Sequence, residues 1–262
     1  MKQITKRGGI IQAKNYSLGI VALVIVMFVM QGCAHRAHAS GNSLRVLFIG
    51  NSFTYVNDMP NIFAELVKQR TPNIQVTGVL RAVGGHTLAQ FSNEKDTMGL
   101  IDSKDGWNYV VLQEQSEMAL YPERRQSMHD SCVFLGRHIK AARARPVLYM
   151  TWADKAKPEN QYQLSTAYTD FGREIDALVV PAGDLFMEVN RAEPSINLYD
   201  TDNHHPSRYG SYLVACLFRD MLTETRAEVQ RFRNAQTPTN GRDPIELKLE
   251  RYADDFALKH MN

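Results

Sequence analysis

Residues 44–54 read LRVLFIGNSFT, an apolar run that ends in a small polar turn. The run 44–49 has the length and the β-branched and aromatic content of a buried strand, and Gly50-Asn51-Ser52 follows it directly. Further apolar runs of strand length stand at 74–80, 109–112, 146–150 and 178–181. The stretches between these runs leave room for crossover helices. This alternation predicts an α/β domain of three layers around a central parallel sheet of about five strands.

The composition excludes several classes of protein. The chain has 262 residues, of which 44% are hydrophobic and 22% charged, as in ordinary globular domains and unlike collagen-like, disordered or disulfide-scaffold proteins. The formal net charge is +2, but four cations and no anion precede Cys33, so the remainder carries more acidic than basic residues. The charge balance therefore gives no reason to expect a nucleic acid partner.

The N-terminal segment is typical of an export signal. Thirteen residues without charge, 18–30, follow the four cations, which is short for a membrane span and suits the core of a signal peptide. Gly32-Cys33 follows this run and resembles a bacterial lipobox, which implies cleavage before Cys33 with lipid on its sulfur. An uncleaved anchor, or a secretory leader cut near residues 37–40, is the alternative.

These features divide the chain into four segments. We predict a lipoprotein signal peptide at 1–32, a tether at 33–43, the α/β domain at 44–224 and a charged, peripheral C-terminal appendage at 225–262. The lipid would hold the protein in the cell envelope, at the outer membrane if the host is Gram-negative. Cys132 and Cys216 lie in apolar, helix-like contexts and are expected to be buried, and their pairing stays open.

Ser52 is a candidate nucleophile because it follows the first predicted strand, and the carboxyl ends of parallel strands carry the chemistry in such sheets. A serine needs a base to take its proton and a third group to orient that base. Asp202 and His205 stand three residues apart in the segment YDTDNHHP, residues 199–206, so the carboxylate can fold back onto the imidazole. His204 competes as the base, but it lies too close to Asp202 along the chain. Ser43 precedes the strand and is expected at the opposite edge.

Four blocks together resemble the SGNH, or GDSL-like, hydrolases. GNSFT at 50–54 is similar to the nucleophile block of that family, and D-x-x-H-P at 202–206 is similar to its final block. GGHT at 84–87 follows the second predicted strand and resembles the glycine block. LQEQS at 112–116 stands in place of the usual Gly-x-Asn-Asp and resembles a bacterial lipoprotein subgroup with Gly-Asn-Ser-Phe and Leu-Gln-Glu-x-Ser blocks.

The resemblance implies a flavodoxin-like three-layer fold and a Ser52-His205-Asp202 triad that needs no cofactor. It implies an oxyanion hole built from the N–H groups of Ser52 and Gly85 and from the side chain of Gln113, with Gln115 as the second choice. A glycine suits the second position because it lets the backbone approach the substrate oxyanion closely.

The implied reaction is removal of an acyl group, acetyl first, from carbohydrate or another small polar ester. An acyltransferase, a lipase or thioesterase on the same triad, and a carbohydrate-binding protein without turnover are the alternatives. We expect no metal ion, although Asp200, Asp202, His204 and His205 are the residue types that could hold one.

Overall fold

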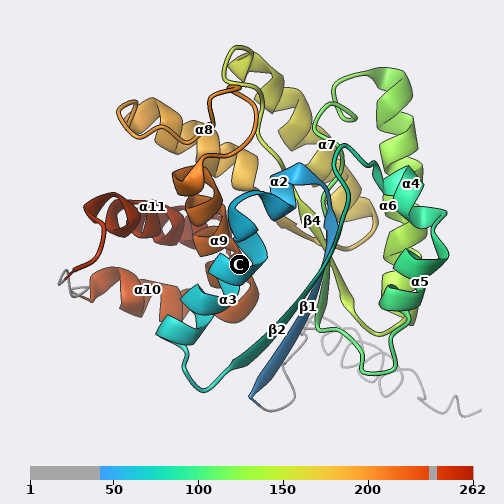
Figure 1. Cartoon of the computed structure of the whole chain (residues 1–262), viewed down its shortest axis with the longest axis horizontal. Coiled ribbons are helices and arrows are strands. Elements are labelled where there is room, and N and C mark those ends of the chain that lie inside the picture. Colours follow the sequence, from blue (N-terminus) through green and yellow to red (C-terminus); the bar gives the residue numbers. More distant parts are fainter. Residues whose placement is uncertain (1–41, 236–240, 262) are drawn as a thin grey trace, which may run out of the picture. The chain divides into compact units, whose positions relative to one another are not determined.

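The computed structural model describes residues 42–235 and 241–261, and the signal segment and Cys33 lie outside this range. A parallel sheet in the order β2-β1-β3-β4-β5 forms the centre (Figure 1). Its strands are β1 (Ser43–Gly50), β2 (Gln75–Ala82), β3 (Tyr109–Leu112), β4 (Arg145–Tyr149) and β5 (Leu178–Val180). The predicted parallel sheet of five strands is therefore confirmed, with strand ends within two residues of the expected positions.

Helices cover both faces of the sheet because the strands are apolar on both faces. Along β1, Leu44, Val46 and Phe48 join one core cluster and Leu47 and Ile49 the other. The first cluster packs against α3 (Met59–Arg70), α8 (Ala182–Ala192), α9 (Arg208–Thr223), α10 (Arg226–Asn234) and α11 (Pro244–His260). The second packs against α4 (Leu88–Ser92), α5 (Lys95–Ile101), α6 (Pro122–Ala141) and α7 (Gln161–Glu174). The two groups lie on either side of the strands in Figure 1, so the three-layer prediction is also confirmed.

The topology brings three strand ends together. The chain passes from β1 to β2 on one side and then crosses to β3 on the other side of β1, and the ligand-binding crevice of such sheets lies where the order reverses. Gly50 pairs with Ala82, and Ile49 pairs with Leu112, so β1, β2 and β3 end at nearly the same level. The loops that follow these strands therefore meet above β1.

The two remaining cysteines are both buried and free. Cys132 is a residue of α6 and belongs to one core cluster, whereas Cys216 is a residue of α9 and belongs to the other. The sheet separates them, so they do not form a disulfide with each other.

In the ranges 42–235 and 241–261, no helix is both long and apolar enough to pass through a bilayer.

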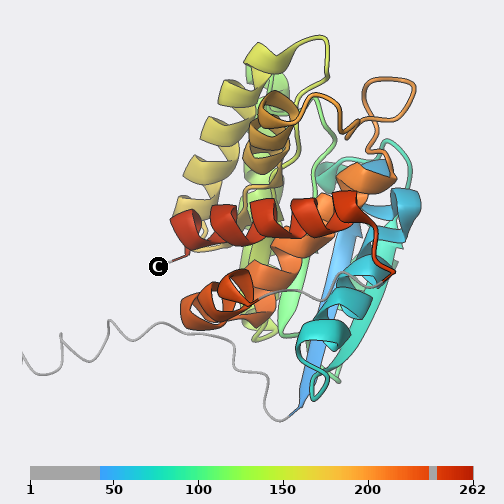
Figure 2. The same ribbon diagram turned by 90° about the vertical axis from the view of Figure 1, so that its left-hand side faces the viewer.

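The C-terminal segment differs from the expected peripheral appendage. The described part of residues 225–262 belongs to the same compact unit as the sheet. Leu249, Ala253 and Phe256 of α11 are buried in the core cluster that also contains β1 residues. Figure 2 shows α11 lying across α9, which it contacts extensively. This segment is therefore an integral part of the helical layer on that face of the sheet.

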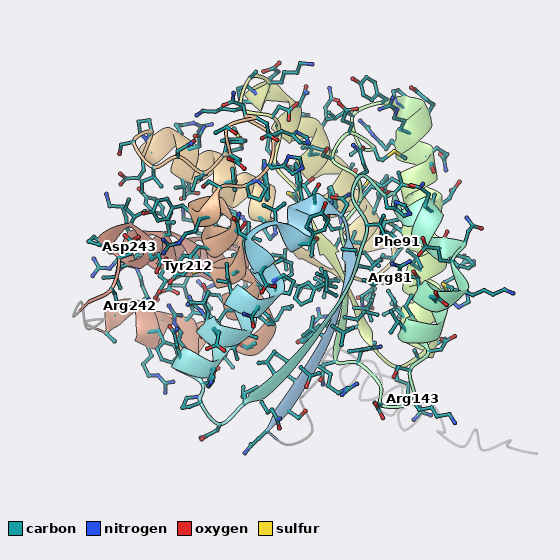
Figure 3. All side chains as sticks on the ribbon, in the orientation of Figure 1. Arg81, Phe91, Arg143, Tyr212, Arg242 and Asp243 are labelled. Carbon is teal, nitrogen blue, oxygen red and sulfur yellow. The ribbon has the colours of Figure 1, made fainter. Side chains whose placement is uncertain are left out.

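Ion pairs explain how the C-terminal segment can be both charged and buried. Arg70 of α3 donates to Asp254 of α11 at 2.8 Å and to Asp220 of α9 at 3.2 Å, and both carboxylates are buried. Arg242, which precedes α11, donates to the hydroxyl of Tyr212 at 3.2 Å (Figure 3). Charged residues can enter a core when they are paired in this way, so charge content alone did not reveal the burial.

The packing of α11 can be tested at Leu249. We expect Leu249→Ala to lower the free energy of unfolding by about 2 to 5 kcal/mol, because the side chain is fully buried and its loss leaves a cavity. Urea denaturation would measure the change. Arg251→Ala, at an exposed position of the same helix, is the matched control and should change stability by less than about 0.5 kcal/mol. Equal, small effects of both substitutions would contradict the integral role of α11.

Candidate active site

The structure brings Ser52, His205 and Asp202 into one hydrogen-bonded chain. The Nε2 atom of His205 lies 2.9 Å from Ser52 Oγ, and its Nδ1 atom lies 2.5 Å from Asp202 Oδ2. The hydrogen bond from the His205 ring, aided by backbone N–H groups, holds the pKa of Asp202 well below its usual range. An ionised Asp202 fixes the proton on Nδ1 and leaves Nε2 as the acceptor that faces the serine.

A left-handed residue shapes the loop that carries the histidine. Asn203 has φ of 58°, and the turn it makes lets Asp202 Oδ1 accept the backbone N–H groups of both His204 and His205, at 3.0 and 2.9 Å. Trp152, in the segment after β4 (Arg145–Tyr149), donates from its indole nitrogen to the His204 carbonyl at 3.0 Å. The loop is therefore fixed both by its own backbone and by the segment that follows β4.

The nucleophile turn is equally constrained. Ser52 begins the short helix α2 (Ser52–Tyr55) immediately after β1. A Cβ on Gly50 would lie 2.6 Å from Gln113 Oε1 and 2.6 Å from Thr54 Oγ1, so only glycine fits there. Asn57 donates from its amide to the Pro206 carbonyl at 3.0 Å, which ties the serine turn to the loop of His205. Ser43 begins β1 at the opposite edge of the sheet, as expected.

A cavity of about 350 Å³ opens beside the serine. Its lining residues come from the ends of β1, β2 and β3 and from the histidine loop: Asn51, Ser52, Phe53, Tyr55, Gly84, Gly85, Gln115, Ser116, His204 and His205. Gly85 has φ of +70°, a conformation that L side chains rarely adopt. Gly84 and Gly85 of the glycine block, the serine and the histidine thus border one cavity.

The solved structures that resemble this chain identify its fold. A candidate SGNH hydrolase from Slackia heliotrinireducens aligns with a TM-score of 0.55 at 29% identity, covering 66% of this chain and 96% of its own. The chain has the SGNH hydrolase fold. A DUF4886 family protein from Bacteroides uniformis has a TM-score of 0.60 at 18% identity, covering 83% and 94%. The psychrotrophic esterase EstA from Pseudoalteromonas sp. has a TM-score of 0.51 at 14% identity, covering 73% and 99%. No protein-family model and no curated protein matches significantly.

Gln113 does not occupy the position expected of an oxyanion donor in this SGNH fold, and the expectation is corrected. Its amide nitrogen donates to Asn51 Oδ1 at 2.9 Å and to the Glu114 carbonyl at 2.5 Å. Its Oε1 atom accepts from the Asn51 N–H and the Thr54 hydroxyl, each at 2.8 Å. The side chain is fully buried and does not line the cavity. Gln113 therefore braces the nucleophile turn, whereas Gln115, the second choice, lines the cavity.

Glu114 is a further residue that the sequence did not single out. Its side chain is fully buried, and its Oε1 atom accepts the N–H groups of Leu88 at 3.0 Å and Gln115 at 2.7 Å. It thereby links the segment after the glycine block to the loop after β3. Within the described residues its Oε2 atom has no hydrogen-bond partner, and burial raises the pKa of Glu114 to about 7.

The raised pKa gives a stability prediction for Glu114→Gln. A carboxyl whose pKa is about 7 when folded and 4.5 when unfolded contributes stability fully below pH 4.5, and the contribution is lost as the pH rises through 7. Gln keeps an oxygen for the two N–H groups and cannot ionise. We therefore expect the variant to be more stable than the wild type at pH 8, by up to about 3 kcal/mol, and equally stable at pH 4.5.

Urea denaturation at the two pH values would measure this difference. Glu117→Gln alters an exposed carboxyl three residues away and serves as the control. A variant whose stability changed with pH in the same way as the wild type would show that Glu114 does not ionise in the assumed range.

His204 has its own carboxylate partner, which sequence spacing could not reveal. Its Nδ1 atom contacts Oδ1 of Asp154, a residue of the loop after β4, and its Nε2 atom lies 3.4 Å from the hydroxyl of Ser116. The two neighbouring histidines thus use two different aspartates, Asp154 and Asp202. Asp200 instead accepts the N–H of Thr201 at 2.7 Å. Among the residues that the structure describes, no three His, Cys, Asp or Glu side chains are grouped to hold a metal ion.

Proposed function

We propose that this chain is a serine ester hydrolase that works through Ser52, His205 and Asp202. The observation that carries the proposal is the relay of 2.9 Å and 2.5 Å hydrogen bonds from Ser52 to His205 to Asp202 at the carboxyl end of β1. A serine, an imidazole and a carboxylate in this order are the parts that nucleophilic acyl transfer requires. The similarity to SGNH hydrolases and to an esterase supports the same class of reaction.

The reaction begins with attack of Ser52 Oγ on the ester carbonyl while His205 Nε2 takes the serine proton. The oxyanion of the tetrahedral intermediate accepts hydrogen bonds from the backbone N–H groups of Ser52 and Gly85, with the Gln115 amide in the role first given to Gln113. His205 returns the proton to the leaving alcohol, and the acyl group stays on Ser52. Water then attacks the acyl carbon while His205 takes its proton, and His205 returns that proton to Ser52 Oγ as the acid leaves. Asp202 stabilises the imidazolium that forms in both halves.

The cavity supports a proposal for the substrate class. Its volume of about 350 Å³ and the hydroxyl, amide and imidazole groups among its lining residues suit a small acyl group on a polar alcohol, so we propose acetyl or another short acyl ester of a carbohydrate or similar polyol. If the substrate carried a longer acyl chain or a thioester, the protein would be a lipase or a thioesterase that uses the same triad. Transfer to a sugar hydroxyl in place of water would make it an acyltransferase.

Export and lipid attachment at Cys33 belong to the same proposal. The leader that motivates them lies outside the described residues, and the argument rests on its charge pattern and on Gly32-Cys33. We expect Cys33→Ser to release the protein from membranes and to abolish labelling by a palmitate analogue. Membrane retention without labelling would instead indicate an uncleaved anchor.

Covalent labelling is the most direct test of the proposed reaction. A fluorophosphonate should label the purified domain at Ser52, and the same protein should hydrolyse p-nitrophenyl acetate faster than esters of long acyl chains. Absence of both labelling and hydrolysis would favour a carbohydrate-binding protein without turnover. Hydrolysis that is fastest with long chains or thioesters would reassign the substrate.

A further inference from the structure

A second histidine, His204, lines the same cavity as Ser52 and His205, and it pairs with Asp154 and not with a member of the proposed triad. His204 and His205 lie side by side with ring centroids 5.1 Å apart and ring planes at 87°. His205 turns its Nε2 atom to Ser52, whereas His204 turns its Nε2 atom to Ser116. Both serines and both histidines line the cavity. The second set therefore faces the same bound molecule from a neighbouring position.

Asp154 determines which ring nitrogen of neutral His204 carries the proton, and Ser116 faces the other ring nitrogen. Asp154 accepts a hydrogen bond from Nδ1 of His204, which places the ring proton there and leaves Nε2 as an acceptor in the neutral imidazole. Ser116 provides a hydroxyl 3.4 Å away, a distance at which a direct hydrogen bond is weak. The pair therefore offers one acceptor and one donor that are not strongly committed to each other.

Ring packing and a backbone hydrogen bond hold His204 in this orientation. Its ring packs against Phe53, with ring centroids 4.8 Å apart, and Phe53 stacks on Trp152. The backbone N–H of Lys155 donates to the Asn203 carbonyl at 3.1 Å, so the loop of Asp154 is fastened to the loop of His204. A rigid donor and acceptor pair is suited to recognition because little conformational freedom is lost on binding.

We infer that Ser116 and His204, oriented by Asp154, form an alcohol subsite that binds a free hydroxyl next to the ester, so that the substrate is the ester of a polyol such as a sugar. A hydroxyl both donates and accepts, which matches His204 Nε2 as acceptor and Ser116 Oγ as donor. A monohydric alcohol has no second hydroxyl to offer, so it leaves the two polar groups of the subsite with only their weak 3.4 Å contacts. This inference rests on the proposed function and specifies the alcohol half of the substrate.

The test compares glycerol monoacetate with propyl acetate, which share the acyl group and a three-carbon alcohol but differ in two hydroxyls. We expect the wild type to favour glycerol monoacetate in kcat/KM by about tenfold or more, the effect of one or two well-placed hydrogen bonds. His204→Ala, Ser116→Ala and Asp154→Asn should each bring this ratio close to one. His129→Ala, which removes a surface histidine that also contacts carboxylates, is the matched control and should leave the ratio unchanged.

Labelling of Ser52 by a fluorophosphonate separates loss of the subsite from loss of the triad. If His204→Ala also stops labelling, Ser116→Ala decides the question, because Ser116 makes no contact with the triad that the structure shows. A ratio that stays at its wild-type value in Ser116→Ala, or a wild type without the preference, would overturn the subsite. A wild type that is neither labelled nor active on either ester would overturn the proposed function itself.

Discussion

Ser52→Ala is expected to lower kcat/KM for ester hydrolysis by about three orders of magnitude or more while the fold remains intact. The substitution removes the atom that attacks the carbonyl, and the residual rate comes from binding and from the remaining oxyanion donors. Ser52 lines a cavity and is only half-buried, so removal of its hydroxyl should lower the stability of the fold very little. Steady-state kinetics on p-nitrophenyl acetate, with circular dichroism to follow the fold, would measure both quantities.

Ser43→Ala is the matched control for this experiment. Ser43 is exposed at the first position of β1, whereas Ser52 follows the last position of the same strand. The strand carries the two serines to opposite edges of the sheet, so Ser43→Ala should be nearly silent. An inactive Ser43→Ala together with an active Ser52→Ala would contradict the placement of the nucleophile.

His205→Ala should reduce turnover almost as strongly as Ser52→Ala, because one imidazole serves both acylation and deacylation. Asp202→Asn should retain a measurable remainder, since the imidazole stays 2.9 Å from Ser52 Oγ but loses the charge that favours its working tautomer. The variants would be compared in kcat/KM on the same activated ester. Fluorophosphonate labelling of Ser52 should slow in parallel.

Chelation distinguishes this mechanism from a metal-dependent one. Wild-type activity should survive exhaustive EDTA treatment, because the proposed steps use only side chains and backbone N–H groups of the protein. Loss of activity in EDTA and its recovery with Zn²⁺ or Mn²⁺ would instead assign Asp200, Asp202, His204 and His205 to a metal site. His205→Ala would be inactive in either case, so the EDTA experiment and the labelling of Ser52 are needed beside it.

Much of the fold could be predicted because its signals are local. Each strand is a short apolar run, and a residue directly after such a run lies at the carboxyl end of its strand. This reasoning placed Ser52 at one edge and Ser43 at the other, and the structure has both there. It also placed Asp202 near His205, because three residues in a turn are enough for the side chains to meet, and the structure shows the contact.

The C-terminal helix could not be predicted in the same way. Its charged residues suggested an exposed segment, yet Asp254 is buried beside Arg70 of α3 and Arg219 of α9. Those partners lie far away in sequence, with Arg70 on α3. Whether a charged side chain is exposed or is paired in the core depends on such distant partners, and the sequence of one segment does not reveal them.

The sequence by itself determined the parallel sheet, the strand that carries Ser52 and the local pairing of Asp202 with His205. Only the tertiary structure decided between Gln113 and Gln115 and joined His204 to Asp154. The physical reason is directional. β3 ends at Leu112, and beyond it the backbone no longer follows the regular alternation of a strand, so spacing along the chain leaves the directions of the Gln113 and Gln115 side chains open. Which of them faces the cavity is settled by the neighbouring loops, which come from distant parts of the chain.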